Sequence, residues 1–133
     1  MAARREAIFT AKAPNPVGPY SQAIRAGKTV YIAGQLGIDA ASGKLVEGGV
    51  AQQARKVLDN LSAIVAEAGG SLSDIVKTTV FLQDFDDFQK MNAVYAEYFG
   101  EAAPARSTIG VARLPANAAV EIEAVLVLGG GDA

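Results

Sequence analysis

The stretch that decides the fold is residues 119–128, which read Ala119-Val120-Glu121-Ile122-Glu123-Ala124-Val125-Leu126-Val127-Leu128. Its even-numbered residues form one apolar face at the period of a β-strand. The opposite face begins with two glutamates and ends with two valines, so it also becomes apolar. Helices on one face of a sheet leave the other face uncovered, and we therefore expect a second subunit to cover this end of the strand.

The rest of the sequence predicts two helices and five more strands. Apolar residues recur at the spacing of one helical face between Gly49 and Gly69, where a Gly-Gly pair ends the helix. A second apolar stripe runs from Phe88 to Phe99, after a cluster of aspartates that complements a helix N-terminus, and Gly100 closes it. The further strands are expected at Ala7–Thr10, Ala23–Ala26, Thr29–Ala33, Val76–Leu82 and Arg106–Val111.

The composition bounds both the fold and the chemistry. At 133 residues the chain fits one domain, which we place at residues 1–133. It contains no cysteine and no histidine. This excludes disulfide frameworks, thiolate nucleophiles, serine–histidine triads and ordinary catalytic zinc sites. Any chemistry must therefore come from arginine, lysine, carboxyl groups, hydroxyls, backbone groups and water.

Charge and hydropathy set the expected partners and location. The formal net charge of −2 argues against nucleic acid or an anionic membrane as a partner, since both call for a concentrated basic surface. The sequence has no apolar run long enough to cross a bilayer, and Met1–Lys12 lacks the apolar segment of a signal peptide. We therefore expect a cytoplasmic protein. Half of the residues are hydrophobic, which is high for a small monomer and favours an oligomer.

Two parts of the sequence carry a resemblance to a known family. The first is Gly18-Pro19-Tyr20-Ser21-Gln22-Ala23, and the second is Pro104-Ala105-Arg106-Ser107 running on to Arg113-Leu114-Pro115 and residues 120–125. The segments between them that are also similar to the family pattern are Ala33-Gly34-Gln35, Leu58-Asp59-Asn60 and residues 74–80. Over nearly its whole length the chain resembles the RidA family, also described as YjgF-like or L-PSP proteins.

The resemblance implies an α+β fold of the chorismate-mutase-like (RidA/YjgF) type, with a mixed six-stranded sheet and two helices on one face. It also implies a homotrimer in which the sheets surround a central barrel and ligand clefts lie between neighbouring subunits. Family members with the active-site arginine hydrolyse 2-imino and 2-enamino acids, such as 2-iminobutanoate and 2-iminopropanoate, to 2-keto acids and ammonia. Pyridoxal-phosphate enzymes such as threonine and serine dehydratases release these compounds, and the resemblance implies no cofactor and no metal.

Two charged residues are the catalytic candidates. Arg106 matches the family's essential arginine, and a guanidinium suits a substrate carboxylate because the two make a planar bidentate pair. From the residues alone, an arginine tied to an acid of a neighbouring subunit is an equally good interpretation. Glu121 is the carboxyl group that the resemblance selects, to position or activate water or to handle the imine proton. Burial would raise its pKa and Arg106 would lower it, and the sequence leaves that balance open.

Tyr20, Gly34 and Thr108 complete the expected substrate-binding set alongside Arg106. Tyr20 lies on a loop rich in proline and glycine and could close over a small ligand, although a packing tyrosine would be more usual. Gly34 lies at the exit of the third strand, and the resemblance implies that its backbone and that of Thr108 meet the imine nitrogen. Thr108 stands where many members have cysteine, which does not affect binding through the backbone.

Other polar residues have simpler interpretations. Glu123 is expected to form salt bridges across a trimer. Asn92 falls at a family-typical position, but a polar residue on a helix is more often solvated, so we leave it out of the site. A divalent ion could in principle bind the aspartates Asp84, Asp86 and Asp87, but capping of the following helix is the simpler explanation for them.

Two other classes of function stay open at this point. Endoribonuclease or translation-inhibitor activity is ascribed to relatives, but the acidic charge and the lack of histidine make phosphodiester cleavage hard to build. A non-catalytic protein that binds 2-keto acids would need Arg106 to hold the carboxylate. Glu121 would be needed mainly in an enzyme, where a water molecule must be positioned for attack. The resemblance therefore favours the imine deaminase.

Overall fold

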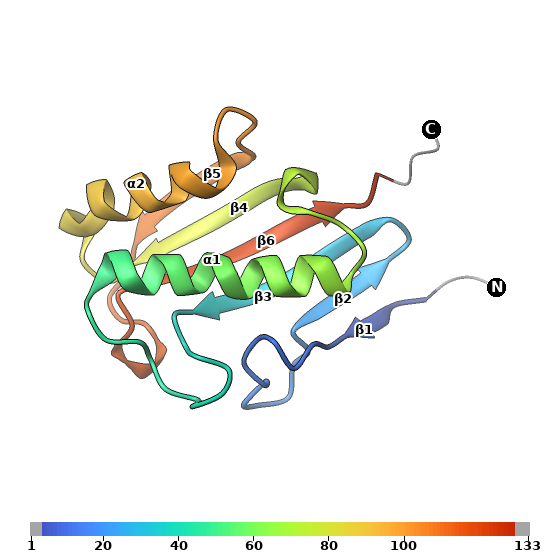
Figure 1. Cartoon of the computed structure of the whole chain (residues 1–133), viewed down its shortest axis with the longest axis horizontal. Helices are drawn as coiled ribbons and strands as arrows, with labels where there is room; N and C mark the ends of the chain where they lie inside the picture. Colours follow the sequence, from blue (N-terminus) through green and yellow to red (C-terminus); the bar gives the residue numbers. More distant parts are fainter. Residues whose placement is uncertain (1–3, 130–133) are drawn as a thin grey trace.

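The computed structural model describes residues 4–129 as one six-stranded sheet with two long helices (Figure 1). The strands are β1 Glu6–Ile8, β2 Ala23–Ala26, β3 Thr29–Leu36, β4 Ile75–Leu82, β5 Ala105–Gly110 and β6 Val120–Val127. The helices are α1 Val50–Glu67 and α2 Phe88–Phe99, and three short 3-10 turns are η1 Leu72–Asp74, η2 Phe85–Asp87 and η3 Pro115–Asn117. The predicted α+β class is confirmed, and so is the order of its helices and strands.

The strands follow the spatial order β1-β2-β3-β6-β4-β5, so the last strand in sequence lies inside the sheet. β6 pairs antiparallel with β3 on one side and with β4 on the other. β4 and β5 are parallel and are joined through α2, which makes the sheet mixed. The strand that the alternation marks as apolar on both faces is therefore a central one.

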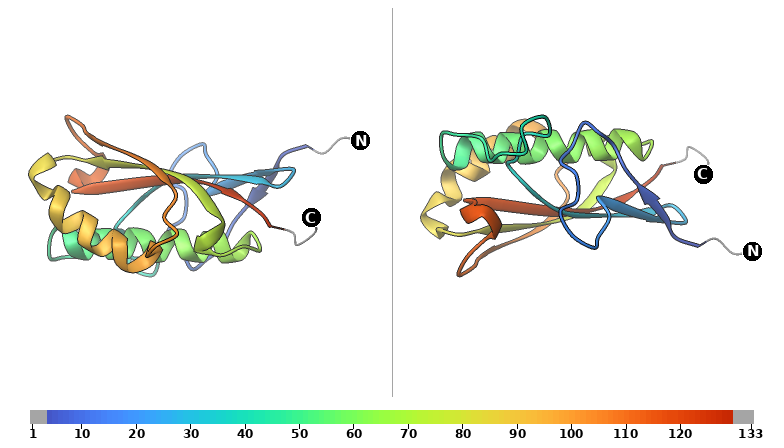
Figure 2. Two further views of the ribbon diagram at one scale, coloured as in Figure 1. Left: turned by 90° about the horizontal axis from the view of Figure 1, so that it is seen from above. Right: turned by 90° about the horizontal axis from the view of Figure 1, so that it is seen from below.

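Both helices lie on the same face of the sheet (Figure 2). Leu58, Leu61 and Ile64 of α1 are fully buried, in one core with Ile122 and Leu126 of β6. The even-numbered side of β6 is thus the side that faces the helices, as the alternation predicts. Within the described residues, neither helix is long and apolar enough to cross a membrane.

The third strand is longer than the sequence predicts. The expectation that it ends at Ala33, with Gly34 at its exit, is wrong, because β3 continues to Leu36. The pairing of β3 with β6 shifts register between Ile32 and Gln35, so Gly34 lies inside the strand at an irregularity of the ladder. Such an extra residue breaks the period of two by which a strand is recognised in a sequence.

One of the aspartates before α2 serves as a cap. Asp84 accepts a hydrogen bond from the backbone amide of Asp86 at 2.9 Å, at the start of η2. This bond satisfies an amide that the turn itself leaves unpaired. Among residues 4–129, no group of three or more acidic residues is arranged to hold a metal ion. Capping therefore accounts for Asp84.

Buried amide side chains fix the loops at one end of the sheet. The side chain of Gln22 forms the pair of backbone hydrogen bonds that a neighbouring strand would form. Its Oε1 accepts from the Thr10 amide at 2.8 Å, and its Nε2 donates to the Thr10 carbonyl at 3.0 Å. Asn60 of α1 donates from Nδ2 to the carbonyl oxygens of Leu36 and Ile38, at 3.1 and 3.0 Å. The segment before β2 and the segment after β3 are therefore both tied to the body of the protein.

The face of the sheet away from the helices carries exposed apolar side chains. Tyr31, Ile109 and Val127 are 54, 46 and 39% exposed. Along β6, buried residues alternate with partly exposed ones as far as Val127. Neither helix of the described chain covers this face (Figure 2), so its apolar side chains remain in contact with solvent in a single subunit.

Candidate active site

Three of the predicted site residues line one cavity. Tyr20, Gly34 and Glu121 surround a space of about 520 Å³ at the end of the sheet where β3 stops. The remaining wall is mostly apolar and comes from the end of β3 and the segments around it, with Pro14, Val17, Leu36, Ile38 and Pro115 among its residues. A cavity with apolar walls and few polar groups is the usual form of a site for a small organic ligand.

Gly34 allows the Glu121 side chain to lie across β3. Glu121 is paired with Leu36 in the ladder, and the register shift brings Gly34 beside its carboxyl group. A Cβ atom on Gly34 would collide with this carboxylate, and its distance to Glu121 Cδ would be only 2.9 Å. Any larger residue would displace the carboxyl group, so glycine is required here for space. The irregular strand thus exposes one carboxyl group to the cavity.

The surroundings of Glu121 favour its neutral form. The side chain is half-buried, and burial raises the pKa of its carboxyl group above the ordinary 4.5, with the charge of Glu123 raising it further. Arg106 does not lower this pKa within the chain. Of the two opposing effects that the sequence leaves open, burial therefore prevails in the subunit. A carboxyl group with a raised pKa exchanges protons closer to neutral pH, which suits general acid–base chemistry.

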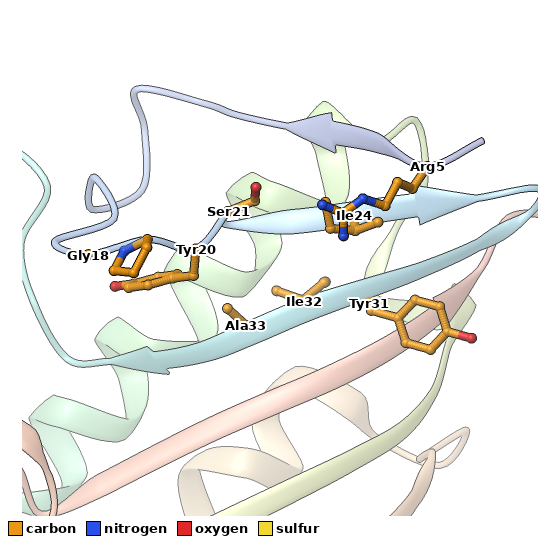
Figure 3. A pocket seen from close by; sticks show the side chains of 9 residues that line it. Arg5, Gly18, Tyr20, Ser21, Ile24, Tyr31, Ile32 and Ala33 are labelled. Carbon is orange, nitrogen blue, oxygen red and sulfur yellow. The ribbon is translucent and has the colours of Figure 1, made fainter. Parts of the chain in front are cut away.

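Tyr20 stands between two recesses on the loop before β2. Its side chain is 51% exposed, and its hydroxyl oxygen accepts a hydrogen bond from the Val17 amide at 3.3 Å. Figure 3 shows the ring beside a second, open hollow of about 590 Å³, which Ile24 and Tyr31 also line and where Arg5 lies near Ile24. Tyr20 lines both recesses, so its ring is available to a ligand on either side.

Arg106 lies away from this cavity, on β5 at the far edge of the sheet. Its guanidinium carbon is 4.6 Å from the centroid of the Tyr95 ring and 5.6 Å from that of Phe88, both on α2. Together with Tyr95 and Asn92 it lines a separate cavity of about 400 Å³. Within the part of the chain that the structure describes, Arg106 has no ion pair. Its charge is therefore not neutralised by a carboxylate of residues 4–129.

Thr108 follows Arg106 on the same strand. β5 is an edge strand that pairs only with β4 in the described chain. The Val111 amide donates to the Leu82 carbonyl on β4, and the alternation along a strand turns the backbone of Thr108 away from β4, toward the open edge. Its hydroxyl oxygen is buried without a hydrogen-bond partner in residues 4–129. The backbone of Thr108 is thus accessible from beyond the edge of the sheet.

The structure gathers three predicted site residues in one cavity and leaves Arg106 and Thr108 apart from them. β4 lies between the strands of Arg106 and Glu121, and the two side chains line different cavities. Two neighbours of Arg106 are missing from the set predicted by sequence: Asn92, interpreted as solvated, and Tyr95, interpreted as core. Their spacing of three on α2 places them on one helix face, and this was the signal available for both.

Known proteins are similar to almost the whole chain. The family model Endoribonuclease L-PSP matches residues 10–128. A RutC family protein of Pyrococcus abyssi is 52% identical over 121 residues, which are 91% of this chain and 95% of that protein. The human 2-iminobutanoate/2-iminopropanoate deaminase is 48% identical over 125 residues, 94% of this chain and 91% of the human protein. The crystal structure of RidA from the Antarctic bacterium Psychrobacter sp. PAMC 21119 matches with a TM-score of 0.90 and 47% identity, covering 92% of this chain and 99% of that one.

Proposed function

The chain belongs to the endoribonuclease L-PSP family, which is the RidA family of the sequence resemblance, and from this membership we propose that it is a 2-iminobutanoate/2-iminopropanoate deaminase. Its substrates are small 2-imino acids and their enamine tautomers, which threonine and serine dehydratases release. The observation that carries the proposal is the half-buried carboxyl group of Glu121, with its raised pKa, in a cavity that Tyr20 and Gly34 also line.

The reaction adds water across a C=N bond and releases ammonium. For the iminium form R–C(=NH₂⁺)–COO⁻, a water oxygen bonds to the imine carbon while the Glu121 carboxylate accepts a proton from that water. The electron pair of the C=N bond moves to nitrogen and leaves a neutral amine on a tetrahedral carbon. Glu121 then returns its proton to this nitrogen. The C–N bond breaks as the hydroxyl oxygen forms the keto group, and the hydroxyl proton leaves with the ammonia as ammonium.

Arg106 holds the carboxylate of the substrate in this mechanism. Its guanidinium stays charged at any working pH, and two parallel N–H groups match the two oxygens of a carboxylate. It stacks on Tyr95 and pairs with no acid within residues 4–129, which leaves it available for an anionic ligand. The backbone of Thr108, on the same strand, and that of Gly34 bind the imine nitrogen.

The active unit in this proposal is a homotrimer, with the open faces of its sheets forming a central barrel. The exposed apolar side chains of Tyr31, Ile109 and Val127 support it, because a neighbouring sheet would remove them from water. Each site then lies between two subunits, where Arg106 of one subunit meets Glu121 of the partner subunit. This arrangement accounts for the two separate cavities of the single chain.

A coupled assay tests the activity directly. Threonine and threonine dehydratase generate 2-iminobutanoate, semicarbazide traps whatever imine survives, and the formation of 2-ketobutyrate is followed with and without the protein. We expect the protein to accelerate keto-acid formation above the spontaneous decay in water. Binding of 2-ketobutyrate without any acceleration would instead select the non-catalytic keto-acid-binding protein.

Variants of the two charged residues separate binding from turnover. Arg106→Ala should lose both affinity and rate, with binding weakened about tenfold or more, since a hydrogen bond to a charged group contributes about 1.5 to 3 kcal/mol. Arg106→Lys should remain badly impaired, because it keeps the charge but loses the two parallel N–H groups. Glu121→Gln should lower turnover about a hundredfold while binding of 2-ketobutyrate survives, because it removes only the proton acceptor. Near wild-type turnover by Arg106→Ala would rule out this site for the deaminase reaction.

A further inference from the structure

We propose that Tyr95 is a positioning residue, which holds the Arg106 guanidinium on the face of its ring and thereby leaves a pair of N–H donors of that arginine free for a carboxylate. The inference deepens the proposed function, since it concerns the same arginine. It rests on the contacts of the ring, on the pairing of β4 with β5, and on the charge balance around Arg106 within the described chain.

The Tyr95 ring is fixed on several sides. It is buried on α2 and packs against the Phe99 ring, with the two centroids 4.6 Å apart. Its hydroxyl is hydrogen-bonded to the Thr78 hydroxyl at 2.6 Å, and Thr78 is fully buried. Thr78 is also the residue that pairs with Arg106 in the ladder between β4 and β5. The ring is therefore tethered to the same point of the sheet from which the arginine side chain starts.

Holding an arginine by an aromatic face differs from holding it by an acid. A carboxylate occupies the N–H groups at the edge of the guanidinium and neutralises its charge. A ring attracts the cation through its flat side, so the N–H groups, which lie in the guanidinium plane, remain free. Within residues 4–129 Arg106 has no ion pair, so no carboxylate of that range neutralises its charge. A hydrogen bond to the Tyr95 hydroxyl uses at most part of its N–H groups, and the others are available to a ligand.

The phenol itself stays neutral. Burial raises the pKa of Tyr95 above its ordinary value of 10.0, and the hydrogen bond to Thr78 and the charge and hydrogen bonding of Arg106 oppose this only in part. Tyr95 therefore contributes a ring and a hydroxyl, and it forms no ion pair that would compete with a substrate carboxylate.

Steady-state kinetics of three variants give the first test. Tyr95→Leu removes the ring and should raise KM about three- to thirtyfold while kcat changes little, because Arg106 itself is retained and only its fixed position for the substrate carboxylate is lost. Tyr95→Phe keeps the ring and should hold KM within about threefold of wild type. Tyr98→Leu is the matched control on the same helix, where the hydroxyl of Tyr98 donates to Asp59 at 2.7 Å instead. A purely structural role of Tyr95 would lower the active fraction, and with it the apparent kcat, without raising KM.

An NMR signature of Arg106 tests the stacking without reference to catalysis. The Nε–Hε signal of Arg106, assigned by its loss in Arg106→Lys, should be shifted upfield by the ring and rigid in wild type. In Tyr95→Leu it should move toward the position of a free arginine and become mobile, and in Tyr98→Leu it should not change. Thr78→Val, which keeps the shape but removes the tether, should shift the signal part of the way. A signal as rigid and as shifted in Tyr95→Leu as in wild type would overturn the inference, even if wild type failed to hydrolyse any imine.

Discussion

Mixing two impaired variants tests the proposed division of each site between subunits. One variant is Arg106→Ala, which lacks the carboxylate clamp, and the other is Glu121→Gln, which lacks the proton acceptor. The two residues line different cavities of one chain. If each site takes Arg106 from one subunit and Glu121 from the partner subunit, a mixed trimer will contain some sites in which both groups are intact.

The expected gain in activity follows from how often an intact arginine and an intact glutamate meet at the same interface. In an equal and random mixture, half of the subunits supply an intact arginine and half supply an intact glutamate, so about a quarter of all sites are complete in a closed ring of identical interfaces. Activity should therefore rise from the residual level of the two parents to about a quarter of the wild-type value. A site built within one chain would give no complete sites at all, because every chain carries a defect.

The matched control uses two residues of the same cavity. Tyr20 and Glu121 line one cavity of the same subunit, so mixing Tyr20→Ala with Glu121→Gln should give no activity above the mean of the two parents. Both mixtures are unfolded together in denaturant, refolded at equal concentrations and assayed by semicarbazide trapping. Mass measurement establishes that mixed trimers have formed. If mixed trimers of Arg106→Ala and Glu121→Gln then show no gain over the parents, the shared site is refuted.

Gly34→Ala should lower turnover about tenfold or more while the protein stays folded, because the added Cβ displaces the Glu121 carboxylate from its position. Circular dichroism checks the folding and the coupled assay checks the turnover, and unchanged kinetics would contradict the close approach of Gly34 to the Glu121 carboxyl group. The value of kcat/KM should fall on acidification while the pH is still above 4.5, because burial raises the pKa of Glu121 and its carboxylate form is lost as the pH falls through that raised pKa. A pH profile of kcat/KM that stays flat down to pH 4.5 would exclude Glu121 as the base. Activity should be indifferent to EDTA and to thiol reagents, since the sequence contains no cysteine and no histidine, and activity lost to EDTA and restored by a divalent ion would speak against this mechanism.

Local periodicity made most of the fold predictable from the sequence. The stripe of α1 and the alternation of β6 are visible because each element buries one face, which leaves a period of 3.6 or 2 in its apolar residues. Strand order is not visible in this way, because the pairing of β6 with both β3 and β4 depends on contacts between distant segments. The irregular pairing at Gly34 escaped prediction because it interrupts the very period that identifies a strand.

The residues of the candidate site were predicted from motifs that resemble a family more than from their spacing or periodicity. Arg106, Glu121 and Tyr20 stand in stretches that resemble a family, and nothing in their spacing indicates that the arginine and the glutamate line different cavities. The stacking of Arg106 on Tyr95 was also not predictable, because an aromatic residue in the apolar stripe of a helix is expected to be an ordinary core residue. A motif names the groups, whereas their partners become apparent only in three dimensions.

A ribosome synthesises β6 after every other strand, although β6 lies between β3 and β4. Every ladder that joins the β1-β2-β3 group to the β4-β5 pair runs through β6. Until residues 120–127 emerge, the nascent chain therefore lacks the strand that joins these two groups. The inner edges of β3 and β4 are unpaired during that interval and can template pairing with another chain. Closure of the sheet thus has to wait until the last strand has been synthesised, and we expect a chain that ends before Val120 to expose these edges.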